Sequence, residues 1–397
     1  MGKSILVQNP YMHAGGAENR QRALMQALVE RADVDRVHFM FIGAEPHHQI
    51  DANGKFHLWQ IRPGRTKAVT KEILKNFEID VVQLHNDQII GTDGLEVAQS
   101  VGIPTAWVMH DFWPLCSQRF MTKVWQADQE EICYKYDGYK CRDCVGDYQY
   151  MMTEKKRNVL NNCDVGIVPS KRIRDIFYDN DLLKDKMEIV EPWIKLDLFQ
   201  PNPSVRKREW QVLFAGNYIP HKGINVLLRA WDLVQRRLPQ SNLVAQGDGR
   251  CKNETIQLAK KLKLTNVNLI ETIPQDQLKN LYNESAVVVF PSFWEETIGL
   301  IWVEALACGT PVICSETGSI PELLRYGGET FEPRNHVELA EKIIKFLLSP
   351  NLRIKYGMEG SRYAHQSFKP SRAANDFMRI YDKLEMMSYE QGIEKSN

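Results

Sequence analysis

The sequence contains no apolar run that approaches the ~18 residues needed to cross a bilayer. Its first residues, MGKSILVQNP, lead directly into a strand-like run and lack the basic stub and apolar segment of a secretory signal. Leu6 stands where the N-myristoylation pattern requires serine or threonine. These absences predict a cytoplasmic protein, with peripheral contact at the inner membrane face as the alternative.

The sequence also lacks an excess of charge of either sign. Lys and Arg number 50, and so do Asp and Glu. A general electrostatic attraction for nucleic acid is therefore absent, and we expect no nucleic acid partner. The 397 residues contain no low-complexity segment, and 43% of them are apolar, as in ordinary globular proteins. This length suggests about two or three domains.

Short β-branched runs alternate with helical patterns along most of the chain. This alternation predicts parallel sheets with right-handed crossovers. It pauses at 191–209, where three prolines and many charges indicate a linker. We therefore expect an α/β protein with two Rossmann-like doubly wound domains, 1–190 and 210–370, facing across a cleft, and a helix within 371–397 that packs on either domain. Strands are predicted at Ile5–Gln8, Val37–Ile42, Val81–Leu84, Ala106–Met109, Val165–Val168, Val212–Ala215, Leu243–Gln246, Val267–Ile270, Val287–Phe290 and Val312–Cys314.

Glycines follow the predicted strands in three loops, at the strand ends where open parallel sheets bind ligands. In NPYMHAGGAEN, Gly15 and Gly16 precede a predicted helix, so the backbone can approach a ligand and the helix offers unpaired amides to an anion. In LFAGNYIPHKGI, Lys222 lies where a second helix opens and could contact a phosphate as a point charge. In AQGDGR, Gly247 permits a turn at the end of a third strand. Taken alone, each loop is equally explained as a turn, and Lys222 as a surface lysine.

The stretch EETIGLIWVEALACGTP, residues 295–311, places a glutamate in an almost wholly apolar helix at about 300–308. An unpaired, ionised Glu304 would cost several kcal/mol to bury or would shift its pKa upward. It therefore needs a partner, either an arginine or ligand hydroxyls. Glu296 lies eight residues earlier, at most about 12 Å away if the segment were helical. Amides at the helix start lie between the two carboxylates, an order that matches a sugar, a diphosphate and a ribose.

The segment PSFWEETIGLIWVEALACGTPVICSETGSIPELL, residues 291–324, resembles the donor-site signature of the family 4 retaining glycosyltransferases of the GT-B fold. The resemblance extends, in the expected order, to GGAE at 15–18, VVQLHN at 81–86, GNYIPHKG at 216–223 and GDG at 247–249, and then to GGETFEP at 327–333. It implies transfer of a sugar from a nucleotide-diphospho-sugar to an acceptor hydroxyl, in glycan or polysaccharide biosynthesis. The acceptor would be a glycan, a lipid-linked molecule or a small molecule, and catalysis would require no cofactor.

The resemblance also implies roles for individual residues. Glu296 would hold the hydroxyls of the donor sugar, Glu304 the ribose, and Lys222 the diphosphate. Family members place a histidine from the first domain in the cleft, and His110 in VMHDFW is the candidate here. Asn217 stands where the family often has arginine, so the diphosphate would lose one cation. The implied catalytic residues are therefore His110, Glu296 and Lys222, and the implied substrate-binding residues are Gly15, Gly16, Asn217, Gly247, Thr297, Ile298, Gly299, Leu300 and Glu304.

Two other functions are compatible with the same architecture. A nucleotide-sugar epimerase would share the fold, although the paired glutamates argue against it. A nucleotide-sugar-binding subunit without turnover is supported only by Asn217. Thr297, which follows Glu296 where glycine is usual, leaves the donor sugar open.

Four of the eight cysteines cluster in an insertion at about 111–147. Cys141 and Cys144 form a C-x-x-C hook, and Cys116 and Cys133 complete a set that matches four-thiolate zinc ligation. We expect either a structural zinc ion that braces the insertion or a set of packed, reduced thiols.

Overall fold

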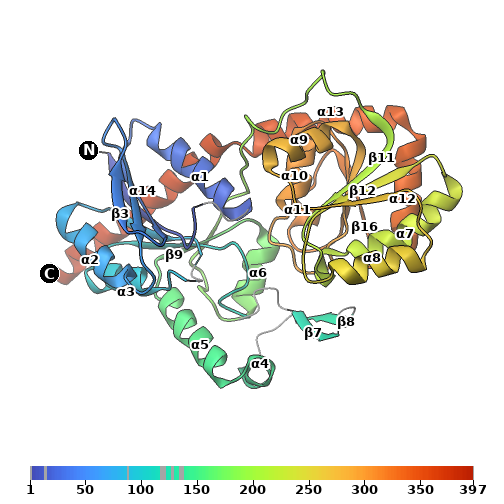
Figure 1. Cartoon of the computed structure of the whole chain (residues 1–397). Helices are drawn as coiled ribbons and strands as arrows, with labels where there is room; N and C mark the ends of the chain where they lie inside the picture. The colour runs from blue at the N-terminus through green and yellow to red at the C-terminus, as the bar shows by residue number, and fades with distance from the viewer. Residues whose placement is uncertain are drawn as a thin grey trace. The chain divides into compact units, whose positions relative to one another are not determined.

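The computed structural model describes residues 2–12, 16–86, 89–116, 122–126, 129–133 and 138–396 (Figure 1). The chain divides into two compact units. The first comprises Met1–Met121, Tyr134–Trp193 and Pro370–Asn397, and the second comprises Thr122–Cys133 and Ile194–Lys369.

The first unit is built on an eight-stranded sheet with the order β10-β9-β6-β5-β1-β2-β4-β3. Neighbouring strands run parallel throughout except for β3 and β4. The order reverses between β1 and β5, which makes the carboxyl ends of these strands the switch point of a Rossmann-like sheet. The strands are β1 (Lys3–Gln8), β2 (Val34–Ile42), β3 (His47–Ile50), β4 (Phe56–Ile61), β5 (Val81–Leu84), β6 (Thr105–Val108), β9 (Val165–Val168) and β10 (Met187–Ile189), and the helices that connect them are α1 (Gly16–Val29), α2 (Thr66–Asn76), α3 (Asp93–Ser100), α5 (Asp147–Asn161) and α6 (Lys171–Asp179).

The last helix, α14 (Pro370–Ser396), packs on the first unit although it follows the second in the chain. It lies beside α1, red beside blue in Figure 1. Phe377 and Tyr381 of α14 are buried in the same apolar core as Ile5 and Leu24. This burial explains why the helix folds onto a sheet whose last strand, β10, ends at Ile189, far before Pro370 in the chain.

The second unit has a six-stranded, fully parallel sheet with the order β13-β12-β11-β14-β15-β16. Its switch point lies between β11 and β14, so the loops after these two strands must come together at the carboxyl edge of the sheet. The strands are β11 (Arg208–Ala215), β12 (Asn242–Gln246), β13 (Val267–Ile270), β14 (Ser285–Phe290), β15 (Val312–Ser315) and β16 (Gly328–Phe331).

Helices cover both faces of this second sheet. Because side chains alternate along a strand, Val212 and Phe214 face one apolar core while Leu213 and Ala215 face the other. Both cores are continuous and buried, which is why the central strands are nearly unbroken apolar runs. Helices α7 (Ile224–Arg237), α8 (Lys252–Lys261) and α12 (His336–Leu348) contribute to one core, and α9 (Gln275–Glu284), α10 (Leu300–Ala307), α11 (Ile320–Leu323) and α13 (Pro350–Ser367) to the other.

The predicted doubly wound α/β fold is confirmed in each unit. Four strands that lie at or near the sheet edges were not predicted from the sequence, namely β3, β4, β10 and β16. The predicted insertion also contains an antiparallel pair, β7 (Thr122–Gln126) with β8 (Gln129–Ile132), and the helix α4 (Gly138–Val145). Among the described residues, no helix combines the length and the apolar character needed to span a membrane.

Candidate functional site

The loops after β11 and β14 are joined at the switch point of the second unit. The carbonyl oxygen of His221 accepts hydrogen bonds from the Phe293 amide at 2.9 Å and from the Ser292 hydroxyl at 3.0 Å. Between them, Gly223 adopts φ +73°, and a Cβ at this position would lie 1.9 Å from the Pro291 carbonyl oxygen. Only glycine therefore permits this close approach of the two loops.

Glu296, in the loop after β14, is 2% exposed, and its carboxylate is held by three donors. Its Oε1 atom accepts from Ser292 Oγ at 2.7 Å, from Trp294 Nε1 at 2.5 Å and from Lys222 Nζ at 2.5 Å. None of the described residues donates a hydrogen bond to the other oxygen, Oε2. Lys222, in the loop that follows β11, also lies over the Trp294 ring, with its Nζ atom 5.2 Å from the ring centroid. The cation and the indole therefore fix the carboxylate in one orientation.

The start of helix α10 offers unpaired backbone amides beside this carboxylate. Gly299 caps the helix in the left-handed region at φ +71°, and α10 begins at Leu300. Within the described part of the chain, the amides of Ile298, Gly299 and Leu300 donate to no protein acceptor. Helix N-termini with free amides carry partial positive charge and bind anions.

The β14 loop is supported from behind by the turn after β15. Ser319 donates from its amide to the Glu296 carbonyl at 2.9 Å and from its hydroxyl to the Thr297 carbonyl at 2.5 Å. Thr317 Oγ1 donates to the Ser292 carbonyl at 3.2 Å. These bonds satisfy the carbonyl groups of Ser292, Glu296 and Thr297.

Two further predicted residues lie in the neighbouring strand-end loops. Gly247, after β12, packs so closely on Gly216 that a Cβ there would lie 1.9 Å from the Gly216 carbonyl oxygen. Asn217, the next residue after Gly216, is exposed. The structure therefore brings Asn217, Lys222, Gly247 and the β14 loop to the same edge of one sheet.

Glu304 is buried in α10, and its partner is a tyrosine. Tyr282 of α9 donates its hydroxyl hydrogen to Oε2 of Glu304 at 2.8 Å, and Gln275 Nε2 makes a longer contact of 3.4 Å with Oε1. Burial raises the pKa of Glu304 to about 7, and the bond from Tyr282 opposes that shift. No cation neutralises this carboxylate among the described residues. The predicted need for a partner is met in part by Tyr282, which the sequence analysis missed because it lies on a different helix.

His110, after β6 of the first unit, belongs to a buried polar cluster. Arg20 of α1 donates to its Nδ1 atom, and its Nε2 lies 2.9 Å from Nδ1 of His85. Because an arginine can only donate, His110 must accept at Nδ1, so a neutral His110 carries its proton on Nε2 and donates it to His85. Burial, the Arg20 guanidinium and His85 hold the pKa of His110 well below its ordinary value. Both ring nitrogens therefore have protein partners.

The remaining predicted residues have different outcomes. Gly16 is the first residue of α1, whereas Gly15 lies outside the described residues. The four-thiolate zinc site has no support, because the described residues contain no group of three or more His, Cys, Asp or Glu placed to hold a metal ion. Cys141 and Cys144 lie on helix α4 instead, and Cys144 is exposed. Cys163, Cys308 and Cys314 are buried free thiols.

Two family models match consecutive parts of the chain. Residues 14–198 match the family described as Glycosyltransferase Family 4, and residues 197–362 match Glycosyl transferases group 1. A D-inositol 3-phosphate glycosyltransferase of Corynebacterium jeikeium is 27% identical over 251 residues, which cover 58% of this chain and 59% of the relative. One of Streptomyces avermitilis is 30% identical over 219 residues, covering 50% and 47%. The chain thus matches only about half of the length of these curated relatives.

Solved structures resemble the chain over almost its whole length. Sucrose-phosphate synthase from Thermosynechococcus elongatus has a TM-score of 0.76 at 19% identity, over 96% of this chain and 99% of that one. Anabaena HepE in complex with UDP-glucose has a TM-score of 0.69 at 16% identity, over 96% and 99%. At sequence identities of 19% and 16%, the structural similarity establishes the fold.

The two Rossmann-like units have the GT-B fold of these solved structures. Together, the two matching models account for residues 14–362 without a break. The chain belongs to glycosyltransferase family 4.

We predict that Glu304 makes the stability of the ligand-free protein depend on pH. Its pKa in the folded state is about 7, against an ordinary value of 4.5, so the folded protein binds the extra proton between these values. The free energy of unfolding should therefore fall as pH rises through this window and level off above about pH 7. Relative to Glu304→Gln, wild-type protein should lose roughly 3 kcal/mol between pH 5 and pH 8, measured by urea denaturation. Glu254→Gln, on the exposed side of α8, should follow the wild type, and parallel profiles for wild type and Glu304→Gln would contradict the assignment.

We predict that His110 and His85 stay neutral at pH values where histidines ordinarily become charged. Burial and the nearby guanidinium favour the uncharged ring in both, so their ¹⁵N shifts should titrate with midpoints well below 6.5. Arg20→Met should raise both midpoints, because it removes the positive charge. Arg22→Met, on the same helix, is the control and should leave them unchanged. A wild-type midpoint for His110 at or above 6.5 would show that the cluster is not formed as described.

Proposed function

We propose that the protein is a retaining glycosyltransferase that moves a sugar from a nucleotide-diphospho-sugar to an acceptor hydroxyl in glycan or polysaccharide biosynthesis. The proposal rests on the carboxyl edge of the sheet in the second unit, where the strands β11 and β14 end. There, Lys222 and three free amides at the start of α10 surround a position suited to a diphosphate. A complex of the structurally similar HepE with UDP-glucose supports a donor of this class.

Glu296 would orient the donor sugar. Its Oε1 atom is fully occupied by Ser292, Trp294 and Lys222, whereas Oε2 lies open to hydroxyl donors. An ionised carboxylate accepts hydrogen bonds only, so it selects groups that donate, such as sugar hydroxyls. The fixed orientation means that little ordering of this side chain is needed when the sugar binds.

Glu304 would bind the ribose. It is buried with one short hydrogen bond, from Tyr282, and it lacks a cation. Ribose hydroxyls would supply further donors and favour the ionised form, which lowers the cost of burying it. Donor binding should therefore displace the proton that Glu304 holds near pH 7.

Lys222 would have two successive partners in this scheme. In the ligand-free protein it pairs with Glu296, and in the complex its ammonium group would turn to the diphosphate. As the bond to the sugar breaks, negative charge grows on the leaving diphosphate, and Lys222 with the α10 amides would stabilise it. The leaving phosphate oxygen would take the proton of the acceptor hydroxyl, which attacks from the same face, so the configuration is retained. No side-chain base and no cofactor are needed. We assign the acceptor side, including His110, to the first unit.

Incubation with labelled donors tests the proposal directly. A panel of nucleoside diphosphates, scored by thermal shift, first selects the base, since a specific ligand raises the melting temperature by mass action. The matching nucleotide-sugars are then supplied with glycan, lipid-linked and small acceptors. Free nucleoside diphosphate with a glycosylated product is the expected result. An altered sugar would show an epimerase instead, and tight binding without product would show a binding subunit.

We predict that the two glutamates can be separated by substitution. Glu304→Gln should weaken binding of the free nucleoside diphosphate at least about tenfold, because a charged acceptor for the ribose is lost. Glu296→Gln should reduce transfer by a similar factor and leave the affinity for the nucleoside diphosphate unchanged. Both affinities are measured by calorimetry, with Glu254→Gln as the control. Equal losses of nucleoside diphosphate affinity in the two variants would refute this division of roles.

We predict that Trp294 acts by positioning Glu296. Trp294→Phe keeps an aromatic ring over Lys222 but removes the indole N–H that donates to Glu296. Loss of one hydrogen bond to a charged group should lower kcat about ten- to a hundredfold. Nucleoside diphosphate affinity should be retained, because the indole N–H contacts Glu296 and not the α10 amides. If nucleoside diphosphate affinity falls as much as kcat does, the ring holds the whole loop and the positioning role is wrong.

A further inference from the structure

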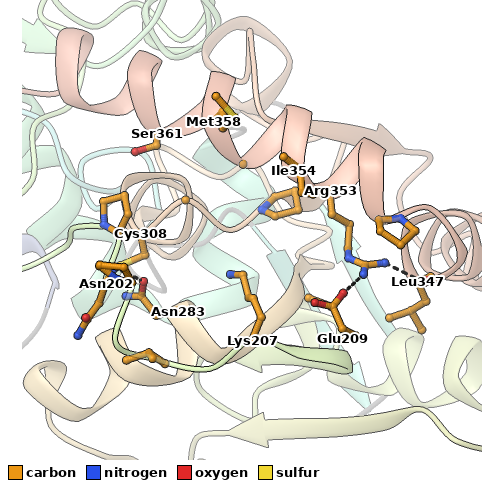
Figure 2. A pocket seen from close by; sticks show the side chains of 18 of the residues that line it. Asn202, Lys207, Glu209, Asn283, Cys308, Leu347, Arg353, Ile354, Met358 and Ser361 are labelled. Carbon is orange, nitrogen blue, oxygen red and sulfur yellow. Dashed lines mark hydrogen bonds and ion pairs between the residues drawn. The ribbon is translucent and has the colours of Figure 1, made fainter.

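A second pocket lies at the opposite edge of the same sheet. It has a volume of about 700 Å³ and is lined by residues that precede the strands, including Lys207 before β11 and Pro311 before β15 (Figure 2). The strands are parallel, so this amino edge lies a full strand length away from the loops that carry Lys222 and Glu296. Helix α13 forms another wall through Arg353, Ile354 and Met358. All of these residues belong to the second unit.

The charges of the side chains that line this pocket do not sum to zero. Arg353 is paired with Glu209 and also donates to the carbonyl oxygens of Phe346 and Leu347 at 2.6 and 2.8 Å. Lys207 has only the Thr310 hydroxyl, at 2.6 Å, as a hydrogen-bond partner. Within the described residues, no carboxylate lies at ion-pair distance from its ammonium group. The pocket therefore holds one uncompensated positive charge.

Lys207 directs this charge into the pocket. Figure 2 shows its side chain pointing into the space beside Asn283 and the Arg353–Glu209 pair. Burial lowers the pKa of Lys207 to about 8, and Arg353 acts in the same direction, against Cys308 and Glu209. Lys207 is exposed to the pocket, and a cation without an anionic partner among the described residues gains free energy when an anion binds beside it.

The rim of the pocket is apolar. Ile354 and Met358 lie one helical turn apart on α13, with 61% and 62% of their surfaces exposed. Pro203 and Trp210 also line the pocket, on the chain that leads into β11 and on that strand. Such a surface binds an apolar body through the hydrophobic effect. One charge at the base and apolar side chains at the rim together select an amphiphilic ligand.

We propose that this pocket binds an organic carboxylate with an apolar body, whose carboxylate pairs with Lys207 and whose apolar part lies against Ile354 and Met358. One unit of negative charge matches the single free cation, and 700 Å³ exceeds what a medium-length alkyl chain requires. The site is separate from the proposed donor site, and its ligand needs no nucleotide. This inference therefore does not depend on the proposed function.

Decanoate is a suitable probe, used below the concentration at which it forms micelles. Calorimetry should show one site on the wild-type protein. Lys207→Met, which keeps the length of the side chain and removes its charge, should weaken binding at least about tenfold. Lys207→Arg should retain the affinity within about threefold. Lys260→Met, on the exposed side of α8, controls for the loss of a surface charge and should match the wild type. Met358→Glu, which places a negative charge at the rim, should also weaken binding.

The pH dependence provides an independent readout. Wild-type affinity for decanoate should fall between about pH 7 and pH 9, as the ammonium group loses its proton, whereas Lys207→Arg should show no such fall. Melting temperatures of the same samples, measured without ligand, show that each variant is folded. Absence of decanoate binding to wild-type protein, equal affinity of Lys207→Met, or equal binding of decanol would each overturn the proposal. Tighter binding of decyl phosphate than of decanoate would overturn the choice of a carboxylate.

Discussion

The carboxylate of Glu296 is the group on which the arrangement of the proposed donor site depends. A buried carboxylate must be compensated, and this one is compensated by donors from two loops that follow different strands. The same loops are tied through the His221 carbonyl and the close approach at Gly223. Because the loops are held together, the free amides at the start of α10 occupy fixed positions before any ligand arrives, and Lys222 needs only to turn from Glu296. The site is therefore largely preorganised, and binding energy is not spent on assembling it.

The two glutamates of the signature show how environment separates residues of one type. Glu296 has an ammonium partner and two neutral donors, and it lies where one of its oxygens stays open. Glu304 has only neutral donors and is enclosed in α10, so its pKa is raised to about 7. A glutamate is thus an oriented hydrogen-bond acceptor at position 296 and a group that holds a proton near pH 7 at position 304.

Much of the fold could be predicted from the sequence because the central strands are covered on both faces. Val81–Leu84 and Val165–Val168 have the predicted bounds, and every residue of both strands is buried. The edge strand Val267–Ile270 was also predicted with its correct bounds, but two other edge strands give a weaker signal. His47–Ile50 is exposed at every residue, and Gly328–Phe331 contains two polar side chains, so neither was recognised.

The candidate site was predictable only in part. Lys222 and Glu296 each follow a strand, and the reversal of strand order brings their loops together. Tyr282 could not be found in this way, because it lies on α9 and no local spacing connects it to Glu304. The C-x-x-C spacing suggested a zinc hook, and Cys141 and Cys144 lie on helix α4, but the described residues place no third ligand group beside them. The spacing of residues along the sequence predicts a site only where that spacing also determines the backbone conformation.

The packing of α14 on the first unit has a consequence for synthesis on the ribosome. The first unit is discontinuous, and Phe377 and Tyr381 enter its core only after the whole of Ile194–Lys369 has been made. The second unit is therefore the first to have all of its core residues in the emerging chain. Until α14 follows, the apolar surface around Ile5 of β1 and Leu24 of α1 lacks the cover of this helix, which exposes the nascent chain to misassembly.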